Sequence, residues 1–223
     1  MWLLAAAALA WVPASAQEAL GDIESERYGE LEKGKSAFKE TWVLPGADLS
    51  KYRNLYLWEA IFEYRDVGDP DRYRSTLSRS SRTTFGIAEE ARTEFEKVVG
   101  ESFLKEIEKG RQYQIVEKIE PNTLILRGGL LDIVSFVPPE TVGRSDVYLS
   151  NIGEATLVIE LLDGDTGTVL AMVSERRKIQ PPGGGQIDRF TMPSTSVTIS
   201  SDVRRWAQSA AAKLRRELEA GMK

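Results

Sequence analysis

Hydrophobic and polar residues alternate most clearly over residues 54–64, which read NLYLWEAIFEY. Alternation with a period of two is typical of a β-strand, and it predicts one continuous strand here. One face of this strand would carry Leu55, Leu57 and Ile61. The other face would carry four aromatic residues, Tyr56, Trp58, Phe62 and Tyr64. Because both faces are apolar, we expect the strand to lie inside the sheet and to be covered on both sides.

Two other stretches have apolar residues at spacings of three and four, which is the pattern of an amphipathic helix. The first helix is predicted over residues 84–109, with Thr84 as its N-cap. The second is predicted over residues 201–220, with Ser200 or Ser201 as its cap. The apolar stripe of the second helix consists of Trp206, Ala210, Leu214 and Leu218.

The remaining periodic stretches predict four more strands, at residues 113–118, 123–137, 154–162 and 168–179. Gly128 and Gly129 interrupt the second of these and predict a bulge or bend there. The sequence DGDTG between the last two strands is typical of a β-hairpin turn. The order β-α-β-β-β-β-α therefore predicts an α+β fold, with a mostly antiparallel five-stranded sheet and two long helices. We expect Trp58 and Trp206 to share one core beneath the last helix.

The beginning of the chain has a different character. Residues 2–12 form an unbroken apolar run, and small residues follow it up to Ala16. This pattern predicts a signal peptide over residues 1–16. The run is shorter than the roughly 20 apolar residues that span a membrane. Residues 17–40 are polar and aperiodic, which predicts a mobile leader, and residues 41–223 are predicted to form a single α+β domain. We therefore expect an exported protein, periplasmic or associated with the envelope, without a transmembrane segment in the mature chain.

Composition narrows the chemistry that this chain can perform. Its 223 residues include no Cys and no His, which excludes Ser-His-acid triads, Cys-His dyads and every thiolate or imidazole metal site. The absence of Cys also excludes lipid attachment through that residue. A formal net charge of −5 disfavours nonspecific binding to nucleic acid. We expect no cofactor, no metal and no nucleic-acid partner.

Three segments together resemble a bacterial family of exported proteins known as domain of unknown function 3313. They are residues 43–53 ahead of a strand, the hairpin formed by residues 160–163 and 166–171, and the closing helix that begins near residues 203–207. The resemblance covers roughly residues 28–220. It implies an envelope location and no particular activity.

Two functions remain open at this stage. The first is a non-catalytic binding or accessory module for a protein, glycan or anionic partner in the envelope. The second is a carboxylate-dependent hydrolase of the envelope, for which Glu59 and Glu63 on one strand face are candidates. Aromatic residues at strand spacing are typical of a core, although the stripe from Tyr56 to Tyr64 could also line a groove for an apolar or sugar ligand.

An arginine-rich segment is the candidate site for an anionic partner. Residues 72–82 contain four Arg and no acid, in a chain that is acidic overall. Guanidinium groups donate paired hydrogen bonds to phosphate and carboxylate, and the segment precedes the predicted first helix, whose N-terminus favours anions. The four candidate residues are Arg72, Arg74, Arg79 and Arg82.

Overall fold

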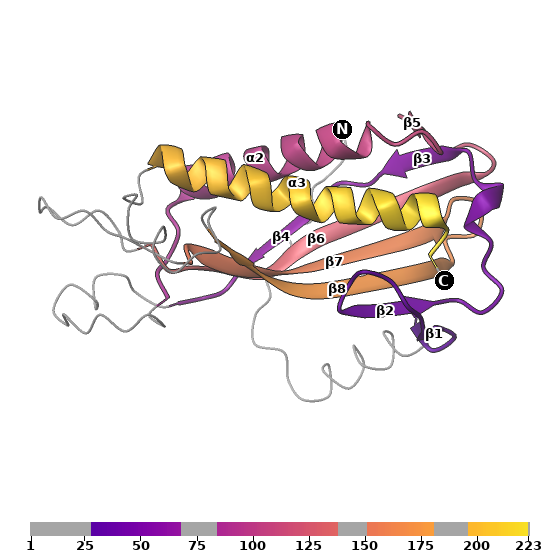
Figure 1. The fold of residues 1–223 in the computed structure, drawn as a ribbon, viewed down its shortest axis with the longest axis horizontal. Helices are drawn as coiled ribbons and strands as arrows, with labels where there is room; N and C mark the ends of the chain where they lie inside the picture. The colour runs from indigo at the N-terminus through magenta and orange to yellow at the C-terminus, as the bar shows by residue number, and fades with distance from the viewer. Residues whose placement is uncertain (1–27, 68–83, 138–150, 181–195, 223) are drawn as a thin grey trace, which may run out of the picture.

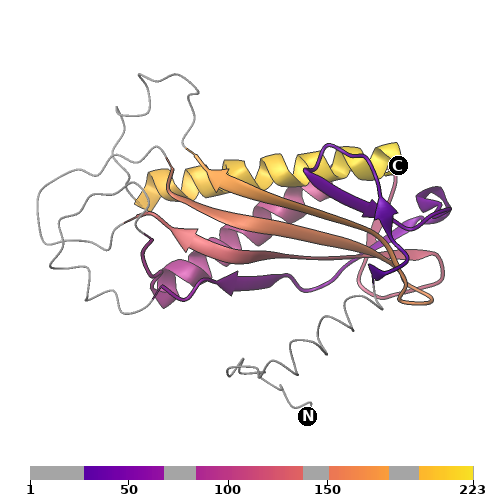
Figure 2. The same ribbon diagram turned by 90° about the horizontal axis from the view of Figure 1, so that it is seen from below.

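The computed structural model of this chain describes residues 28–67, 84–137, 151–180 and 196–222. They form two layers, an eight-stranded sheet and two long helices that lie together on one face of it (Figure 1, Figure 2). This arrangement confirms the α+β class, but the sheet has more strands than the predicted five. The predicted signal peptide lies outside the described residues.

Three long antiparallel strands form the centre of the sheet. They are β6 (Thr123–Ser135), β7 (Gly153–Asp163) and β8 (Val169–Ile179). The predicted hairpin joins β7 to β8, and Gly167 in its turn has a φ of 73°, a conformation that favours glycine. The full strand order is β1-β2-β8-β7-β6-β3-β5, with β4 also paired to β6.

Two short strands that the sequence pattern did not predict extend the sheet beyond β8. These strands are β1 (Glu32–Lys33) and β2 (Glu40–Val43), and β2 pairs antiparallel with β8. Phe38, between them, is buried in the main core. The described part of the segment for which a leader was predicted therefore contributes to the sheet and the core.

The prediction of one strand over residues 54–64 is wrong. The segment forms two strands, β3 (Asn54–Leu57) and β4 (Ile61–Tyr64), and each pairs in parallel with β6. β3 also pairs in parallel with β5 (Gln114–Val116). The interruption at residues 58–60 changes the phase of the alternation. As a result Leu57 and Phe62, which were predicted on opposite faces, both pack against the main core.

Both helices were predicted, but each begins at a different residue. The first is α2 (Glu89–Ile107), with Ala88 as its N-cap. Ahead of it, Phe85 forms an isolated antiparallel bridge with Ser135, and its backbone N–H donates to Ser135 O at 2.8 Å, so this part of the predicted helix is paired with a strand end instead. The second is α3 (Ser196–Ala220), which begins ahead of the predicted caps. Ile199 packs against the main core, and this packing outweighs the weak helix propensity of a β-branched residue.

Two predictions about the core are corrected by the structure. Trp206 is buried, but Trp58 is 50% exposed, so the two do not share a core as predicted. The second correction concerns β6, where a bulge or bend was predicted at Gly128 and Gly129. The irregularity of this strand lies further along the chain. Its pairing with β7 shifts register between Leu131 and Val134, and Asp132 there has a φ of 54°.

Candidate functional site

Small residues face one another between the sheet and the helices, and they leave a cavity. Along β6, Leu126 and Leu130 pack into the main core, and Gly128 occupies the position between them on the same face. Across the layer, α3 presents Ala207 and Ala210. Larger side chains, among them Leu130 on β6 and Trp206 on α3, also border the space, but a cavity of about 220 Å³ remains.

We call this space the apolar cavity. It lies between α2, α3 and the strands β3, β4, β6 and β7. Every residue that lines it is apolar or glycine. These residues are Leu57, Trp58, Ala60, Phe62, Val99, Gly100, Phe103, Leu104, Leu126, Gly128, Gly129, Leu130, Leu157, Ile159, Trp206, Ala207 and Ala210.

The apolar cavity opens to solvent between α2 and the connection from β3 to β4. Gly100 and Leu104, one helical turn apart, are the exposed lining residues on α2, and Trp58 and Ala60 are exposed on the opposite side. Of the four large apolar side chains that are exposed among the described residues, two, Trp58 and Leu104, line the cavity. The opening therefore concentrates exposed apolar surface.

Part of the lining of the apolar cavity is fully buried. Leu157 and Ile159 on β7 are buried there, as is Trp206 on α3. The indole Nε1 of Trp206 has no hydrogen-bond partner in the part of the chain that the structure describes. Arg177 lies 6.0 Å from the Trp206 ring, measured from its Cζ to the ring centroid, and burial lowers the pKa of this arginine.

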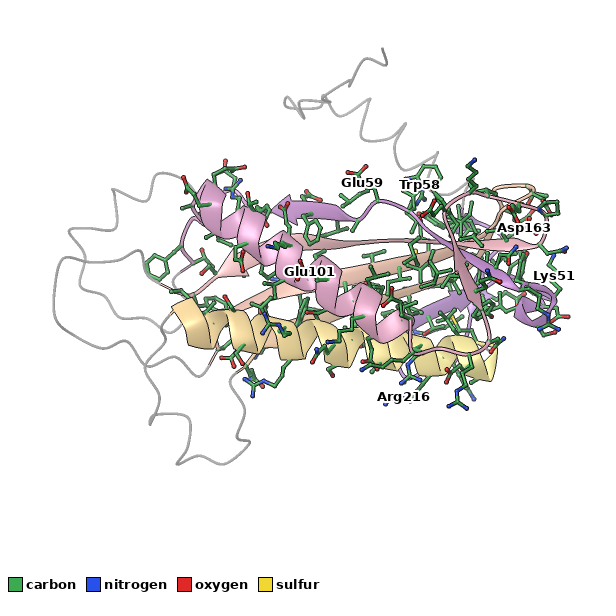
Figure 3. All side chains as sticks on the ribbon, turned by 90° about the horizontal axis from the view of Figure 1, so that it is seen from above. Lys51, Trp58, Glu59, Glu101, Asp163 and Arg216 are labelled. Atoms are coloured by element: carbon green, nitrogen blue, oxygen red, sulfur yellow. The ribbon has the colours of Figure 1, made fainter. Side chains whose placement is uncertain are left out.

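The acids proposed for hydrolysis do not converge on this space. Glu59 lies in the connection between β3 and β4, Glu63 lies on β4, and both are exposed. Figure 3 shows Glu59 beside Trp58 on the strand side of the molecule, with Glu101 on α2. Arg127, which could have paired with these acids, instead forms an ion pair with Glu160. In the described ranges no cluster of three or more acids suits a metal ion.

The aromatic stripe predicted on one strand face is divided between two faces of the sheet. Phe62 and Tyr64 contact Phe95 of α2 edge-on, within the main core. Tyr56 instead joins a smaller apolar cluster with Ile125, Leu162 and Val169. Trp58 contacts Tyr56 edge-on, with ring centroids 6.1 Å apart. The stripe is thus partly core, and Trp58 alone of its members lies half exposed at the opening.

A polar cluster at the other end of the sheet ties together three segments. The hydroxyl of Tyr52 donates to Asp163 Oδ2 at 2.6 Å, and Lys51 Nζ donates to the same oxygen at 3.2 Å (Figure 3). Asp163 Oδ1 accepts the backbone N–H groups of Asp165 and Thr166 at 2.8 and 3.2 Å. Burial raises the pKa of Asp163, but these hydrogen bonds outweigh it and bring the pKa to about 2. This cluster fastens the β7–β8 turn, so we assign it a structural role.

A second depression, of about 540 Å³, lies between the β1–β2 end of the sheet, the turn at residues 43–50 and the end of α3. Half of its lining residues are exposed, and only Leu49 and Met222 are buried. It lacks the enclosure of the apolar cavity. We therefore take the apolar cavity as the candidate site.

The four arginines predicted to bind an anion, Arg72, Arg74, Arg79 and Arg82, lie outside the described residues. The apolar cavity itself was not predicted from the sequence. One signal for it was present, because Gly128 takes the place of an inward side chain in the alternation of Leu124, Leu126 and Leu130. Within the described residues no helix is long and apolar enough to cross a membrane.

No family model and no curated protein matches this sequence. Solved structures of several bacterial proteins are similar at low identity, among them the following three. PelC, from a dodecamer of Paraburkholderia phytofirmans, is 9% identical over 83% of this chain and 94% of its own, with a TM-score of 0.34. A Xanthomonas campestris protein of family DUF330 is 11% identical over 82% and 90%, with a TM-score of 0.40. A putative neuraminyllactose-binding hemagglutinin homolog from Helicobacter pylori is 12% identical over 74% and 82%, with a TM-score of 0.37. Likenesses this weak carry no argument about function, and they do not confirm the resemblance to domain of unknown function 3313.

Proposed function

We propose that this chain is a non-catalytic binding protein of the bacterial cell envelope, and that it holds an apolar group of its ligand in the apolar cavity. One observation carries the proposal. The cavity is lined by apolar residues and glycine alone, and its lining includes two of the four large apolar side chains that are exposed among the described residues, Trp58 and Leu104. Exposed apolar surface collected around a hollow is typical of a place that a ligand or partner covers.

The size of the apolar cavity indicates how much of a ligand it holds. An apolar cavity of about 150 Å³ in another protein stays dry and binds benzene, so about 220 Å³ is ample for a small apolar group. Pockets that enclose a whole drug-sized ligand are larger, about 300–1,000 Å³. We therefore expect one end of the ligand inside and the remainder outside.

The geometry supports binding more than hydrolysis. A carboxylate hydrolase needs two acids that converge on a cleft, usually with perturbed pKa values. Glu59 and Glu63 are exposed and neither lines the apolar cavity. The lining also favours a ligand with a hydrocarbon part over a bare glycan, because hydroxyl groups buried there would find almost no hydrogen-bond partners.

The envelope location rests on the sequence. The apolar run that ends at Ala16 supports export, and the absence of Cys means that no lipid is attached through that residue. We propose that the mature chain begins at Gln17 and meets its ligand or partner in the periplasm or at the envelope.

Filling the apolar cavity tests the proposal. Ala210 is 2% exposed on α3 and lines the cavity, so Ala210→Leu should fill part of it without disturbing the helix. Ala220→Leu makes the same change at an exposed position in the last turn of α3, outside the apolar cavity, and is the matched control.

The three proteins are incubated with an organic extract of bacterial envelopes and recovered, and the bound small molecules are identified by mass spectrometry. We expect an apolar-tailed compound on the parent and on Ala220→Leu, and a strongly reduced amount on Ala210→Leu. Equal amounts on all three proteins, or none on any, would contradict the proposal. Thermal melting of each variant shows whether it is folded.

A further inference from the structure

We propose that the outer edge of β4 is a second binding surface, to which a partner polypeptide adds an extended strand that carries lysine or arginine. This inference goes beyond the proposed function, because it concerns the edge of the sheet and not the apolar cavity. The open backbone of β4, the exposed side chains along it and their charge all point to such a partner.

The backbone of β4 is unpaired along one side. In the part of the chain that the structure describes, β4 pairs with β6 alone, whereas β3 pairs with β6 on one side and with β5 on the other. β4 therefore lies at the margin of the sheet (Figure 2). Trp58 N–H donates to Leu126 O at 2.9 Å, and Arg65 N–H donates to Ile133 O at 3.0 Å. The margin is thus longer than β4 itself, since residues 58–65 run beside β6.

The backbone groups that point outward belong to Phe62 and Tyr64. Arg65 N–H bonds to β6, and the carbonyl oxygen of Ile61 also faces β6, where it lies against Gly129. Backbone groups of successive residues in a strand point to opposite sides, so the N–H and C=O groups of Phe62 and Tyr64 point away from β6. Within the described ranges none of these groups has a hydrogen-bond partner. They form the template with which an additional strand pairs.

The edge lacks the features that usually prevent such pairing. Exposed edge strands are commonly protected by lysine, proline, a bulge or a covering segment. β4 contains neither lysine nor proline, and the extra residue at its register shift lies on β6, so β4 itself remains regular. Ile61 is 57% exposed, and Trp58, three residues before it, is 50% exposed. Apolar surface along an open backbone edge is well suited to burial under an added strand.

The charge of the edge indicates the chemistry of the partner. Glu59 and Glu63 are exposed on β4 and in the connection before it, and neither has an ion-pair partner among the described residues. Figure 3 shows Glu59 beside Trp58 on this side of the molecule. A lysine or arginine opposite Glu63 would form a cross-strand pair of opposite charges. A second copy of this chain fits less well, because two β4 strands would bring the same acids together and like charges are destabilising.

Short peptides test the proposal on the whole chain. The probe is a fluorophore-labelled peptide of about eight residues that alternates lysine and valine, and its binding is followed by fluorescence anisotropy. The same peptide with every backbone nitrogen methylated removes the hydrogen-bond donors and keeps the side chains. A peptide that alternates glutamate and valine reverses the charge. Both comparison peptides should bind at least about tenfold more weakly than the probe.

Two measurements locate the bound peptide. Hydrogen exchange at the amides of Phe62 and Tyr64, followed by NMR, should slow when the lysine–valine peptide is added, because these N–H groups then donate to it. Glu63→Lys should weaken binding about fivefold at low salt and much less at high salt. The matched control is Glu108→Lys, which makes the same charge change at an exposed residue at the end of α2 and should bind as the parent does.

The outcomes separate this inference from the proposed function. Ala210→Leu, which fills the apolar cavity, should bind the peptide as the parent does. Peptide binding that is lost in Ala210→Leu and unchanged in Glu63→Lys would place the peptide in the cavity and overturn the inference. Equal binding of the methylated and unmethylated peptides, or unchanged exchange at Phe62 and Tyr64, would also overturn it and leave the cavity proposal standing. An envelope extract that loads no compound, with the peptide bound as expected, would overturn the proposed function alone.

Two other occupants of the edge are outcomes of the same test. A second copy of the chain would be detected as a dimer in analytical ultracentrifugation, and the lysine–valine peptide would dissociate it. Residues 72–82 of this chain would be identified by peptide binding that occurs only after their four Arg are replaced by Ser. Either result would overturn the assignment of the edge to a partner polypeptide.

Discussion

Acidification from pH 7 to pH 2 should weaken this protein through one carboxyl group in particular, Asp163. The residue is 8% exposed, and its two carboxylate oxygens accept four hydrogen bonds. These bonds bring its pKa from 3.8 to about 2 in the folded chain despite its burial. At about 1.4 kcal/mol per unit of pKa, the difference corresponds to roughly 2 kcal/mol of unfolding free energy.

The direction of the effect follows from linkage. The folded pKa lies below the unfolded one, so the contribution is fully present above pH 4 and is lost as the pH falls from about 4 toward 2. Urea unfolding at a series of pH values measures it. Many carboxylates titrate in this window, so the informative quantity is the difference between the parent and Asp163→Asn. The parent should lose about 2 kcal/mol more than Asp163→Asn between pH 5 and pH 2.

The matched control is Asp165→Asn, in the same turn but exposed, which should follow the parent across the series. A second variant, Tyr52→Phe, keeps the buried ring and removes the hydroxyl that donates to Asp163. This variant should lower the free energy of unfolding by about 1–2 kcal/mol at pH 7 and raise the pKa of Asp163. Parallel loss of stability in the parent and Asp163→Asn below pH 4 would refute the reasoning.

Three further predictions follow from burial and from the sequence. Trp206→Ala should lower the free energy of unfolding, measured with a chemical denaturant, by about 3–5 kcal/mol, because the side chain is only 7% exposed. Trp58→Ala should lower it by less than about 1 kcal/mol, because that side chain is 50% exposed. Comparable losses in the two variants would contradict the assignment of Trp206 alone to the core. Replacement of the four Arg in residues 72–82 by Ser should reduce retention on anionic envelope polymers at low salt far more than at high salt, and equal retention by mutant and parent would end that hypothesis. Mass spectrometry of the protein recovered from the envelope should find a chain that begins after Ala16, and an intact Met1 would exclude cleavage.

The parts of the fold that were predicted correctly have signals that are local in sequence. In the β7–β8 turn, Asp163 and Gly167 satisfy the geometry of a tight hairpin by themselves, and Gly167 N–H donates to Asp163 O at 2.8 Å. The apolar stripe of α3 likewise depends only on residue spacing within one helix, and its residues Ala210 and Leu214 are buried as predicted.

The parts that were missed depend on partners far along the chain. β2 is four residues long and exists because β8, more than a hundred residues later, pairs with it. The segment 54–64 is apolar on both faces, so its alternation does not fix which residues face the helices, and the break at 58–60 could not be placed. The exposure of Trp58 is a consequence of that break.

The apolar cavity could not have been predicted from the sequence either, because the role of a glycine depends on which element packs against it. Two adjacent glycines of β6 illustrate this. A Cβ at Gly129 would lie 2.6 Å from the carbonyl oxygen of Ile61, so this glycine is required by the close approach of β4 to β6. A Cβ at Gly128 would lie 3.2 Å from Val158 O and 3.4 Å from Ile159 Cγ1, tight but not prohibitive contacts. Gly129 therefore serves the pairing of strands, whereas Gly128 lines the apolar cavity together with the small residues Ala207 and Ala210 of α3. Whether a glycine marks a bend, a close approach or a hollow is decided by the element that packs against it, and α3 is the last element of the chain.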